Sequence, residues 1–300
     1  MTSPAATDAQ PTAHKTALHV EGDSEIDALL AQVFASESWT VQRTPTNASA
    51  IELVAAHSYN LIVTSERTTG HEDILLLREI RRIRPSSCLI ILTAHGTPLD
   101  VIDAMREHAF SYFSTPFSSV SLAEMIRRVN DGPCCDDGIE VVSATPEWIR
   151  LKARCDFKTA DRLLQFLQEI TVLPEPERME LAVASRELLY NAIEHGGNLD
   201  PSKTVEIEYV RAQSMVTCRI SDHGPGFDFD KIPHAAVANP PDDPVRHIGV
   251  REEKGLRPGG YGVLMARKLV DEVIYSQNGS EVLLVKYLRP RHQAQSTGLH

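Results

Sequence analysis

The chain has 300 residues, of which 42% are hydrophobic and 24% are charged. This balance is ordinary for a globular protein and excludes wholesale disorder, collagen-like repeats and a coiled-coil rod. At roughly 150 residues per domain, the length predicts two domains. The 41 acidic and 30 basic residues give a net charge of −11. Because an acidic chain has no long-range field that attracts nucleic acid, direct DNA binding is not expected.

The cysteine and apolar patterns favour the cytoplasm. The five cysteines are odd in number and include no Cys-x-x-Cys pair, which indicates neither a disulfide framework nor a zinc ribbon. Because adjacent cysteines rarely bridge, we expect reduced thiols at Cys134 and Cys135. The longest apolar runs, such as Leu89–Leu92, are too short to span a membrane. Residues 1–15 lack the apolar core of a signal peptide.

Composition divides the chain into two folded parts. Residues 1–15 and 290–300 are rich in small and polar residues, and we expect flexible tails there. Turn-forming residues mark 131–145 as a linker. The predicted domains are therefore residues 16–130 and 146–289.

The first part alternates strand and helix. Strands are expected at Ala17–Val20, Thr40–Arg43, Leu61–Thr64, Leu89–Thr93 and Ser111–Phe113. Helices are expected at Ile26–Glu37, Ala48–His57, Ile74–Arg84, Leu99–Glu107 and Leu122–Val129. This alternation predicts a doubly wound α/β fold with a parallel sheet, and its ligand crevice would lie at the carboxyl ends of the strands.

The second part has a different order of elements. We expect helices at Ala160–Thr171, Glu175–His195 and Val263–Val270. We expect strands at Ile149–Cys155, Thr204–Val210, Val216–Ser221, Glu272–Tyr275 and Val282–Tyr287. This order predicts an α+β sandwich. The long polar stretch Phe229–Pro258 is typical of a functional loop or lid.

Several segments of the first part resemble the receiver domain of bacterial response regulators. These segments are Tyr59–Val63, Leu75–Pro85, Leu89–Ala94 and Tyr112–Phe117. In that family an Asp at the end of the third strand accepts phosphate. Ser65 stands at that position here, and a Ser hydroxyl without an adjacent base is a weaker nucleophile than a carboxylate. A slip of one residue in the alignment would place Glu66 there instead, although neighbouring strand residues face opposite ways.

The other receiver positions are also altered. The resemblance implies two acidic residues that hold magnesium, but only Glu21 is acidic and Gly22 replaces the other. Thr115 replaces the Lys that contacts the phosphoryl group, whereas Thr93 keeps the switch hydroxyl. The loss of one carboxylate weakens a cation site. We therefore expect a pseudo-receiver with a structural, regulatory or dimerising role that takes no phosphate by the usual route.

A polar stripe marks the longest predicted helix of the second part. Glu187, Asn191 and His195 are spaced four residues apart and would project from one helix face. A carboxylate and an amide oxygen are hard ligands that suit magnesium on a polyphosphate. A solvated helix face would show the same spacing.

Two glycine motifs follow along the chain. Asp222, Gly224 and Gly226 come directly after a strand, where the glycines permit a tight turn and the close approach of a ligand. A buried Asp there can accept a hydrogen bond from an exocyclic amine. Gly260 and Gly262 open a helix whose N-terminal N–H groups favour phosphate. An ordinary β-turn and a flexible loop would account for the same glycines.

A fourth motif, Gly279-Ser280, lies between the last two strands and could place a hydroxyl near a bound base or form a hairpin turn. The order and spacing of the four motifs resemble the GHKL ATPase superfamily, which includes histidine kinases, gyrase and mismatch-repair ATPases. The resemblance covers about residues 146–289. It implies the GHKL, or Bergerat, ATP-binding fold, with ATP and Mg²⁺ as cofactors.

The resemblance also implies roles for individual residues. Asn191 would hold magnesium, Asp222 would read adenine, and Ser280 would lie near the base. The two glycine boxes would be Gly224, Gly226, Gly260 and Gly262. The stretch Phe229–Pro258 would be the ATP lid, with Arg251 as the favoured phosphate contact among its cations.

Within the superfamily, the helix around Glu187 resembles that of the anti-sigma-factor serine kinases. The linker is too short for the helical hairpin of a histidine kinase, and His71-Glu72-Asp73 is expected in a turn-like stretch. The resemblance implies that Glu187 is the base that accepts the proton of the substrate hydroxyl. It also implies a small STAS-type antagonist as substrate, possible binding of a sigma factor, and a homodimer.

Two functions fit the sequence. One is an ATP-dependent serine/threonine protein kinase with a pseudo-receiver as regulatory module. The other is a nucleotide-sensing module that captures a partner without phosphotransfer. The acidic, proline-rich segment Pro240–Pro244 motivates the second, because it departs from a short kinase lid.

Overall fold

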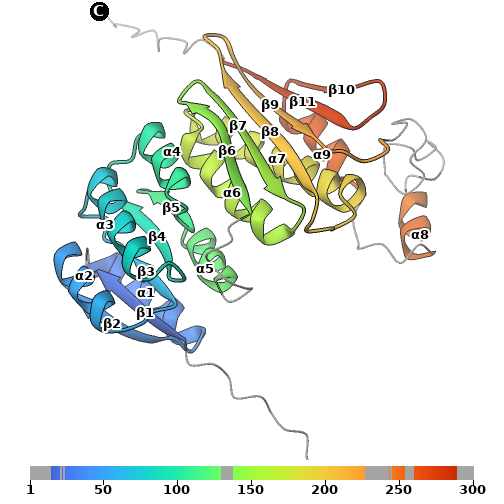
Figure 1. Cartoon of the computed structure of the whole chain (residues 1–300). Coiled ribbons are helices and arrows are strands. Elements are labelled where there is room, and N and C mark those ends of the chain that lie inside the picture. The colour runs from blue at the N-terminus through green and yellow to red at the C-terminus, as the bar shows by residue number, and fades with distance from the viewer. Residues whose placement is uncertain are drawn as a thin grey trace, which may run out of the picture. The chain divides into compact units, whose positions relative to one another are not determined.

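The computed structural model describes residues 15–20, 22, 24–129, 138–226, 243, 245–253 and 260–288. Figure 1 shows the helices and strands of these residues. The chain divides into two compact units, the first from residues 1–96 and 113–135 and the second from residues 97–112 and 136–300. The boundary between the units therefore passes through a strand of the first predicted domain.

Five strands form the sheet of the receiver-like part, in the order β2-β1-β3-β4-β5. They are β1 (Thr16–Val20), β2 (Thr40–Thr44), β3 (Leu61–Val63), β4 (Cys88–Thr93) and β5 (Ser111–Ser114). β1 pairs in parallel with β2 and β3, and β3 pairs in parallel with β4. Every residue of β3 and β4 is buried, as expected for parallel strands covered on both faces. The predicted parallel α/β sheet is confirmed.

Helices follow these strands in alternation. They are α1 (Ser24–Ser36), α2 (Asn47–Ala56), α3 (Gly70–Ile83), α4 (Pro98–Arg106) and α5 (Ser119–Arg128). A threonine begins each of α2, α3 and α4 with a reciprocal capping box. In α3 the box joins Thr69 and Glu72, so this helix begins four residues before Ile74. The expectation of a turn-like stretch at His71–Asp73 was therefore wrong, because the cap starts the helix there.

A six-stranded antiparallel sheet forms the core of the second part, in the order β10-β11-β9-β8-β7-β6. Its strands are β6 (Ile139–Thr145), β7 (Trp148–Arg154), β8 (Thr204–Arg211), β9 (Met215–Ser221), β10 (Glu272–Tyr275) and β11 (Glu281–Tyr287). Burial alternates along β7, β8 and β9. One face is therefore covered and the other is open. The helices α6 (Phe157–Ile170), α7 (Glu175–Asn191) and α9 (Gly262–Leu269) lie on the covered face (Figure 1). The predicted α+β architecture is confirmed.

The edge strand β6 was not predicted. Ile139–Thr145 fell within the expected linker, but it pairs with β7, so the linker prediction was wrong for these residues. The register shifts between Val141 and Ser143. Such an irregularity disrupts the period-2 pattern by which a strand is found in a sequence.

The helix predicted to reach His195 changes its winding before that residue. α7 ends at Asn191, and Ala192–Gly196 forms a π-helical turn. Gly197 N donates to Ala192 O at 2.8 Å, which is the i→i+5 spacing of a π-turn. The wider turn moves His195 out of the four-residue register that joins Glu187 and Asn191.

One helix lies within the predicted lid. α8 spans Arg246–Glu253, and most of the remaining lid lies outside the described residues. His247 of α8 is buried, and its ring meets that of Tyr261 edge-on, with centroids 4.5 Å apart and planes at 90°. This contact joins α8 to the residue that precedes α9.

Two findings bear on the predicted compartment. Cys88, at the start of β4, is disulfide-bonded, although the cysteine pattern indicated no disulfide framework, and Cys134 and Cys135 lie outside the described residues. Cys155 and Cys218 are free and buried. In the part of the chain that the structure describes, no helix is both long and apolar enough to cross a bilayer.

Candidate functional site

The C-terminal half of α7 meets the N-terminus of α9. A Cβ atom added to Gly262 would collide with Glu187 Oε2, so the Glu187 carboxylate lies directly against the first residue of α9. Asn191 is one turn further along α7 and is half-buried. Neither the Glu187 nor the Asn191 side chain forms a hydrogen bond or ion pair with another described residue. A carboxylate and an amide beside a helix N-terminus fit a phosphate group and its divalent cation.

Asp222 follows β9, and glycines surround its carboxyl group. A Cβ atom on Gly196 would collide with the carboxyl carbon of Asp222, and one on Gly224 would lie 2.8 Å from Asp222 Oδ1. Gly224 N donates to Asp222 Oδ1 at 2.8 Å. Burial raises the pKa of the Asp222 carboxyl, and the Gly224 hydrogen bond partly opposes this shift. Such a half-buried carboxyl can accept a hydrogen bond from the exocyclic amine of a base.

The first glycine box packs against the β10–β11 hairpin. Gly226 has a φ of +71°, and a Cβ atom there would collide with Asn278 O. Asp222 N donates to Ser280 O at 3.0 Å. The Ser280 hydroxyl donates to Asn278 Oδ1 at 3.1 Å. The backbone carbonyl oxygen of Ser280 thus binds Asp222, whereas the Ser280 hydroxyl forms a hydrogen bond within the hairpin turn.

Sequence reasoning gave no role to the residues beneath Asp222. A Cβ atom on Gly197 would collide with Cys155 Sγ, just as one on Gly196 would collide with Asp222. Burial raises the pKa of Cys155 to about 11, and the charge of Asp222 adds to the shift. The thiol is therefore neutral near pH 7 and acts as a packing group. The adjacent glycines after the polar helix were the signal that could have located this contact.

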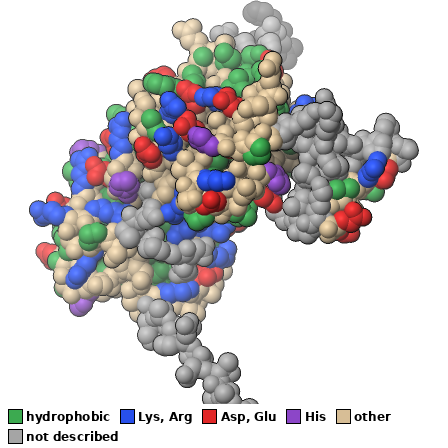
Figure 2. Space-filling view, turned by 45° about the vertical axis from the view of Figure 1, so that its right-hand side comes forward, with side chains coloured by type: hydrophobic (Ala, Val, Ile, Leu, Met, Phe, Trp, Pro, Cys, Tyr) green, Lys and Arg blue, Asp and Glu red, His purple; other side chains and the backbone are tan. Residues whose placement is uncertain are grey.

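Other predicted residues are placed only in part. Gly260 has a φ of +95°, which a glycine adopts readily. Arg251 belongs to α8, but its side chain lies outside the described residues, as does Glu21. Figure 2 shows Lys and Arg side chains interspersed with Asp and Glu on the described surface.

Three of the predicted receiver positions, the altered Ser65 and Thr115 and the retained Thr93, lie at strand ends. Ser65 is buried two residues after β3, and its Oγ accepts from Arg67 N at 3.2 Å. Thr93, the last residue of β4, donates its hydroxyl to Thr68 O at 3.0 Å. Thr115 follows β5, and its N donates to Thr93 O at 3.0 Å. The positions carried over from the receiver pattern thus occupy the carboxyl ends of β3, β4 and β5.

Glu66 occupies the position left by Gly22. The Glu66 side chain is buried, and a Cβ atom on Gly22 would collide with both of its carboxylate oxygens. An acidic side chain at position 22 would need the same space. The carboxylate that the sequence lacks after β1 is therefore replaced, in space, by one that follows β3.

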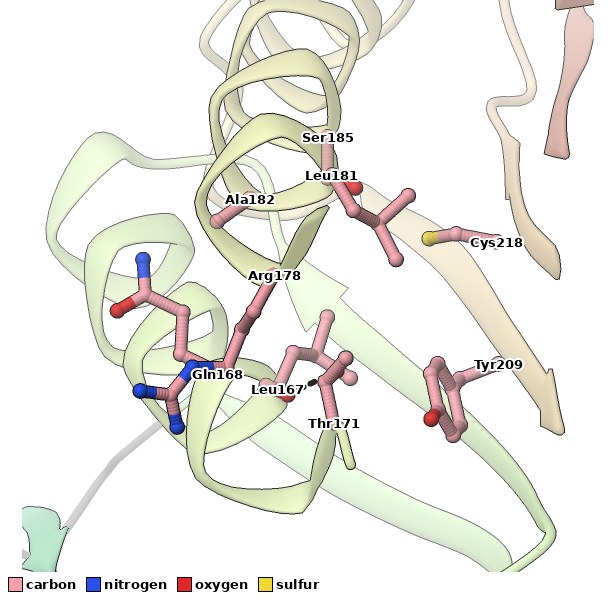
Figure 3. A pocket seen from close by; sticks show the side chains of 9 residues that line it. All are labelled: Leu167, Gln168, Thr171, Arg178, Leu181, Ala182, Ser185, Tyr209 and Cys218. Atoms are coloured by element: carbon pink, nitrogen blue, oxygen red, sulfur yellow. Dashed lines mark hydrogen bonds between the residues drawn. The ribbon is translucent and has the colours of Figure 1, made fainter. Parts of the chain in front are cut away.

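A small cavity lies away from these residues, between α6, α7 and the sheet (Figure 3). Its volume is about 20 Å³, which is room for about one water molecule. Its lining consists of Leu167, Gln168, Thr171, Arg178, Leu181, Ala182, Ser185, Tyr209 and Cys218. It contains none of the predicted nucleotide-binding residues and is too small for a nucleotide.

The two parts match different families. Residues 17–127 match the response regulator receiver domain, and residues 153–286 match the histidine kinase-like ATPase domain. Serine-protein kinase RsbW of Oceanobacillus iheyensis is 32% identical over 110 residues, which cover 36% of this chain and 65% of RsbW. Transcriptional regulatory protein GlrR of Escherichia coli is 26% identical over 144 residues, which cover 46% of this chain and 32% of GlrR.

A CheY-like receiver domain from Methanospirillum hungatei is a structural neighbour, with a TM-score of 0.36 and 20% identity over 40% of this chain and 96% of that domain. The chain spans less than two thirds of the length of the two curated relatives. The family matches divide the chain as the two sheets do. The chain therefore carries a response regulator receiver domain followed by a histidine kinase-like ATPase domain.

Proposed function

We propose that the protein is an ATP-dependent serine/threonine protein kinase of the anti-sigma-factor type. Its substrate would be a Ser or Thr of a small STAS-type antagonist, and a sigma factor and a second copy of the chain would be further partners. The observation that carries the proposal is the Glu187 carboxylate, which lies against Gly262 at the start of α9. The similarity to serine-protein kinase RsbW supports the same function.

The residues of the site suit phosphoryl transfer. Bound ATP would supply the γ-phosphoryl group, with Mg²⁺ to neutralise its charge. Asn191 would hold the cation through its amide oxygen, and Asp222 would accept a hydrogen bond from the adenine amine. The N–H groups at the start of α9 would stabilise phosphate charge. Glu187 would accept the proton of the attacking hydroxyl.

The receiver domain would regulate this kinase without accepting phosphate itself. Ser65 stands where the acceptor carboxylate would be, and the carboxylate of Glu66 fills the space beside Gly22. The Thr93 hydroxyl is already bonded to Thr68 O. We therefore propose that the domain acts through its packing and its partners.

The test combines ATP affinity with phosphotransfer. Full-length protein is incubated with labelled ATP, Mg²⁺ and candidate STAS-type antagonists. Glu187→Gln should lower the rate of transfer by about 10²- to 10⁴-fold, because it removes the base, while ATP still binds. Glu194→Gln, a matched change seven residues along the chain, should keep the wild-type rate. Separately, Asn191→Ala and Asp222→Ala should weaken ATP binding.

Two results would overturn the proposal. Equal transfer rates for wild type and Glu187→Gln would remove the base from the mechanism. Unchanged ATP affinity in both Asn191→Ala and Asp222→Ala would remove the nucleotide site. ATP binding and partner capture without any phosphoprotein would instead select the nucleotide-sensing alternative, whose motivating segment Pro240–Pro244 lies, except for Asp243, outside the described residues.

A further inference from the structure

A buried arginine of α6 holds the turn between α4 and β5. Only 2% of the Arg162 side chain is exposed. Its Nε donates to Phe110 O at 2.8 Å, and its Nη2 donates to Ala109 O at 3.1 Å. The guanidinium carbon lies 4.6 Å from the ring centroid of Phe110. Because a buried guanidinium needs its hydrogen-bond partners, separating this turn from α6 would be costly.

A residue of the next turn of α6 forms a hydrogen bond with β5. Gln165 is buried, and its Nε2 donates to Tyr112 O at 3.1 Å. β5 is one of the two edge strands of the receiver sheet, and an edge strand presents backbone groups without a strand partner. Arg162 and Gln165 are three residues apart on one helix face and satisfy carbonyl oxygens of the same segment. This segment, Thr97–Tyr112, belongs to the compact unit that contains α6.

The residue before Arg162 contacts the helix that carries the candidate site. The Tyr190 hydroxyl donates to Asp161 Oδ1, and Tyr190 immediately precedes Asn191. The Tyr190 ring packs on Phe157 of α6, with centroids 4.7 Å apart. Burial and the Asp161 hydrogen bond raise the pKa of Tyr190, so its phenol stays a donor near pH 7. The side chains of Phe157 and Asp161 thus join α6 to the C-terminal end of α7.

We propose that α6 couples the Thr97–Tyr112 segment to the nucleotide site, because Arg162 and Gln165 bind the segment and the neighbouring Asp161 binds Tyr190 beside Asn191. The inference rests on the proposed binding of ATP at Asn191. Because adjacent residues of one rigid helix make both sets of contacts, a shift at the end of α7 changes the hold on β5. Such coupling is reciprocal, so changes in the segment alter nucleotide affinity. The segment lies within the receiver match, residues 17–127, and thus gives that domain a route to the kinase site.

The experiment measures hydrogen–deuterium exchange of amides 97–112 in the full-length protein, with and without Mg²⁺ and a non-hydrolysable ATP analogue. Tyr190→Phe removes the hydroxyl that reaches Asp161 and keeps the aromatic ring. The matched control is Tyr287→Phe, because Tyr287 also donates to a carboxylate, that of Glu272, but at the β10–β11 end of the sheet. Without nucleotide, Tyr190→Phe should speed exchange in the segment by about fivefold or more, and Tyr287→Phe should not.

Addition of the nucleotide analogue should change the exchange rate of the segment in the opposite direction. The analogue should slow exchange at 97–112 in wild type by a similar factor, and Tyr190→Phe should reduce that protection. Unchanged exchange in nucleotide-free Tyr190→Phe would overturn the coupling, and so would a bound analogue that leaves 97–112 unaffected. If the analogue does not protect residues 187–191 or 222–226, the proposed ATP site fails, while the nucleotide-free comparison still decides whether α6 joins the two places.

Discussion

Asp73, on α3, is a fully buried carboxyl group, and its burial favours the protonated form. Its oxygens lie within hydrogen-bond distance of Asn47 Nδ2, Thr64 Oγ1 and Thr68 Oγ1. Each threonine hydroxyl has one proton and a second acceptor, which is Leu92 O for Thr64 and Ser65 O for Thr68. If either hydroxyl donates to its carbonyl, Asp73 must supply the proton to that hydroxyl. Burial raises the pKa of Asp73 to about 7, although the hydrogen bonds from Asn47, Thr68 and Thr64 partly oppose this shift.

The first prediction concerns the pH dependence of Asp73. Between the ordinary pKa of 3.8 and about 7, the folded protein keeps a proton that the unfolded chain releases. The free energy of unfolding should therefore fall as pH rises through this window, by at most about 4 kcal/mol at 1.36 kcal/mol per pKa unit. Asp73→Asn should abolish this part of the slope, because an amide has no proton to lose and keeps both hydrogen-bonding roles.

The measurement is urea unfolding from pH 4 to 8, followed through the fluorescence of Trp39 in a Trp148→Phe background. Trp39 lies in the same compact unit as Asp73, whereas Trp148 lies in the other, so the signal reports the relevant unit. Glu79→Gln, a change at a partly exposed residue of the same helix, is the control and should leave the slope as in wild type. Parallel pH profiles for wild type and Asp73→Asn would contradict the prediction.

At the scale of elements, two glycines of the ATPase domain are predicted to respond in opposite ways. Gly226 has a φ of +71°, and an added Cβ atom would collide with Asn278 O. Gly226→Ala should therefore destabilise the domain by more than the ~1–2 kcal/mol that a left-handed alanine costs by itself. Gly249, within α8, has no atom within 4 Å of an added Cβ. Gly249→Ala should be neutral or stabilise by up to about 1 kcal/mol, as alanine does in an exposed helix.

Thermal unfolding of the full chain measures both changes. A lower transition temperature for Gly226→Ala with none for Gly249→Ala is the expected pair of results. Equal behaviour of the two variants would show that the contact between the first glycine box and the β10–β11 hairpin carries little stability. ATP affinity of Gly226→Ala should also fall, because the same turn positions Asp222.

The elements that the sequence predicts well are those with a strong period or a buried run. β3 and β4 are buried throughout and are apolar except for Thr93, and the predicted bounds differ by a residue at most. The sequence did not predict β6, because its register shifts at Val141 and because turn-forming residues precede it. The sequence did not predict α8, because apolar residues do not recur at helical spacing in the polar stretch around it. The π-turn at Ala192–Gly196 follows from local winding, which side-chain periodicity does not report.

At the scale of the whole molecule, motif order predicted which segments assemble, but not how they touch. The pairing of Glu187 with Gly262 joins helices that are distant in the chain, and it follows the predicted order of polar helix and glycine box. The packing of Gly197 on Cys155 depends on the end of β7 meeting the turn after the π-helix. Likewise, nothing in the sequence distinguishes Arg162 from any other basic residue of a helix. Only the folded chain shows that it is buried against Phe110.

The last prediction is that phosphate chemistry is confined to the ATPase domain. Ser65→Asp restores an acceptor carboxylate, yet we expect neither wild type nor this variant to gain label from labelled acetyl phosphate with Mg²⁺. The reason is that Glu66 fills the space beside Gly22 and that Thr115 supplies no cation. A matched variant that combines Ser65→Asp with Gly22→Asp, Glu66→Ala and Thr115→Lys should accept label, because it frees the space, restores the second acidic residue and adds the lysine. Labelling of Ser65→Asp alone would show that the substituted pocket still binds the cation and phosphate, and that the receiver domain is one residue away from phosphotransfer.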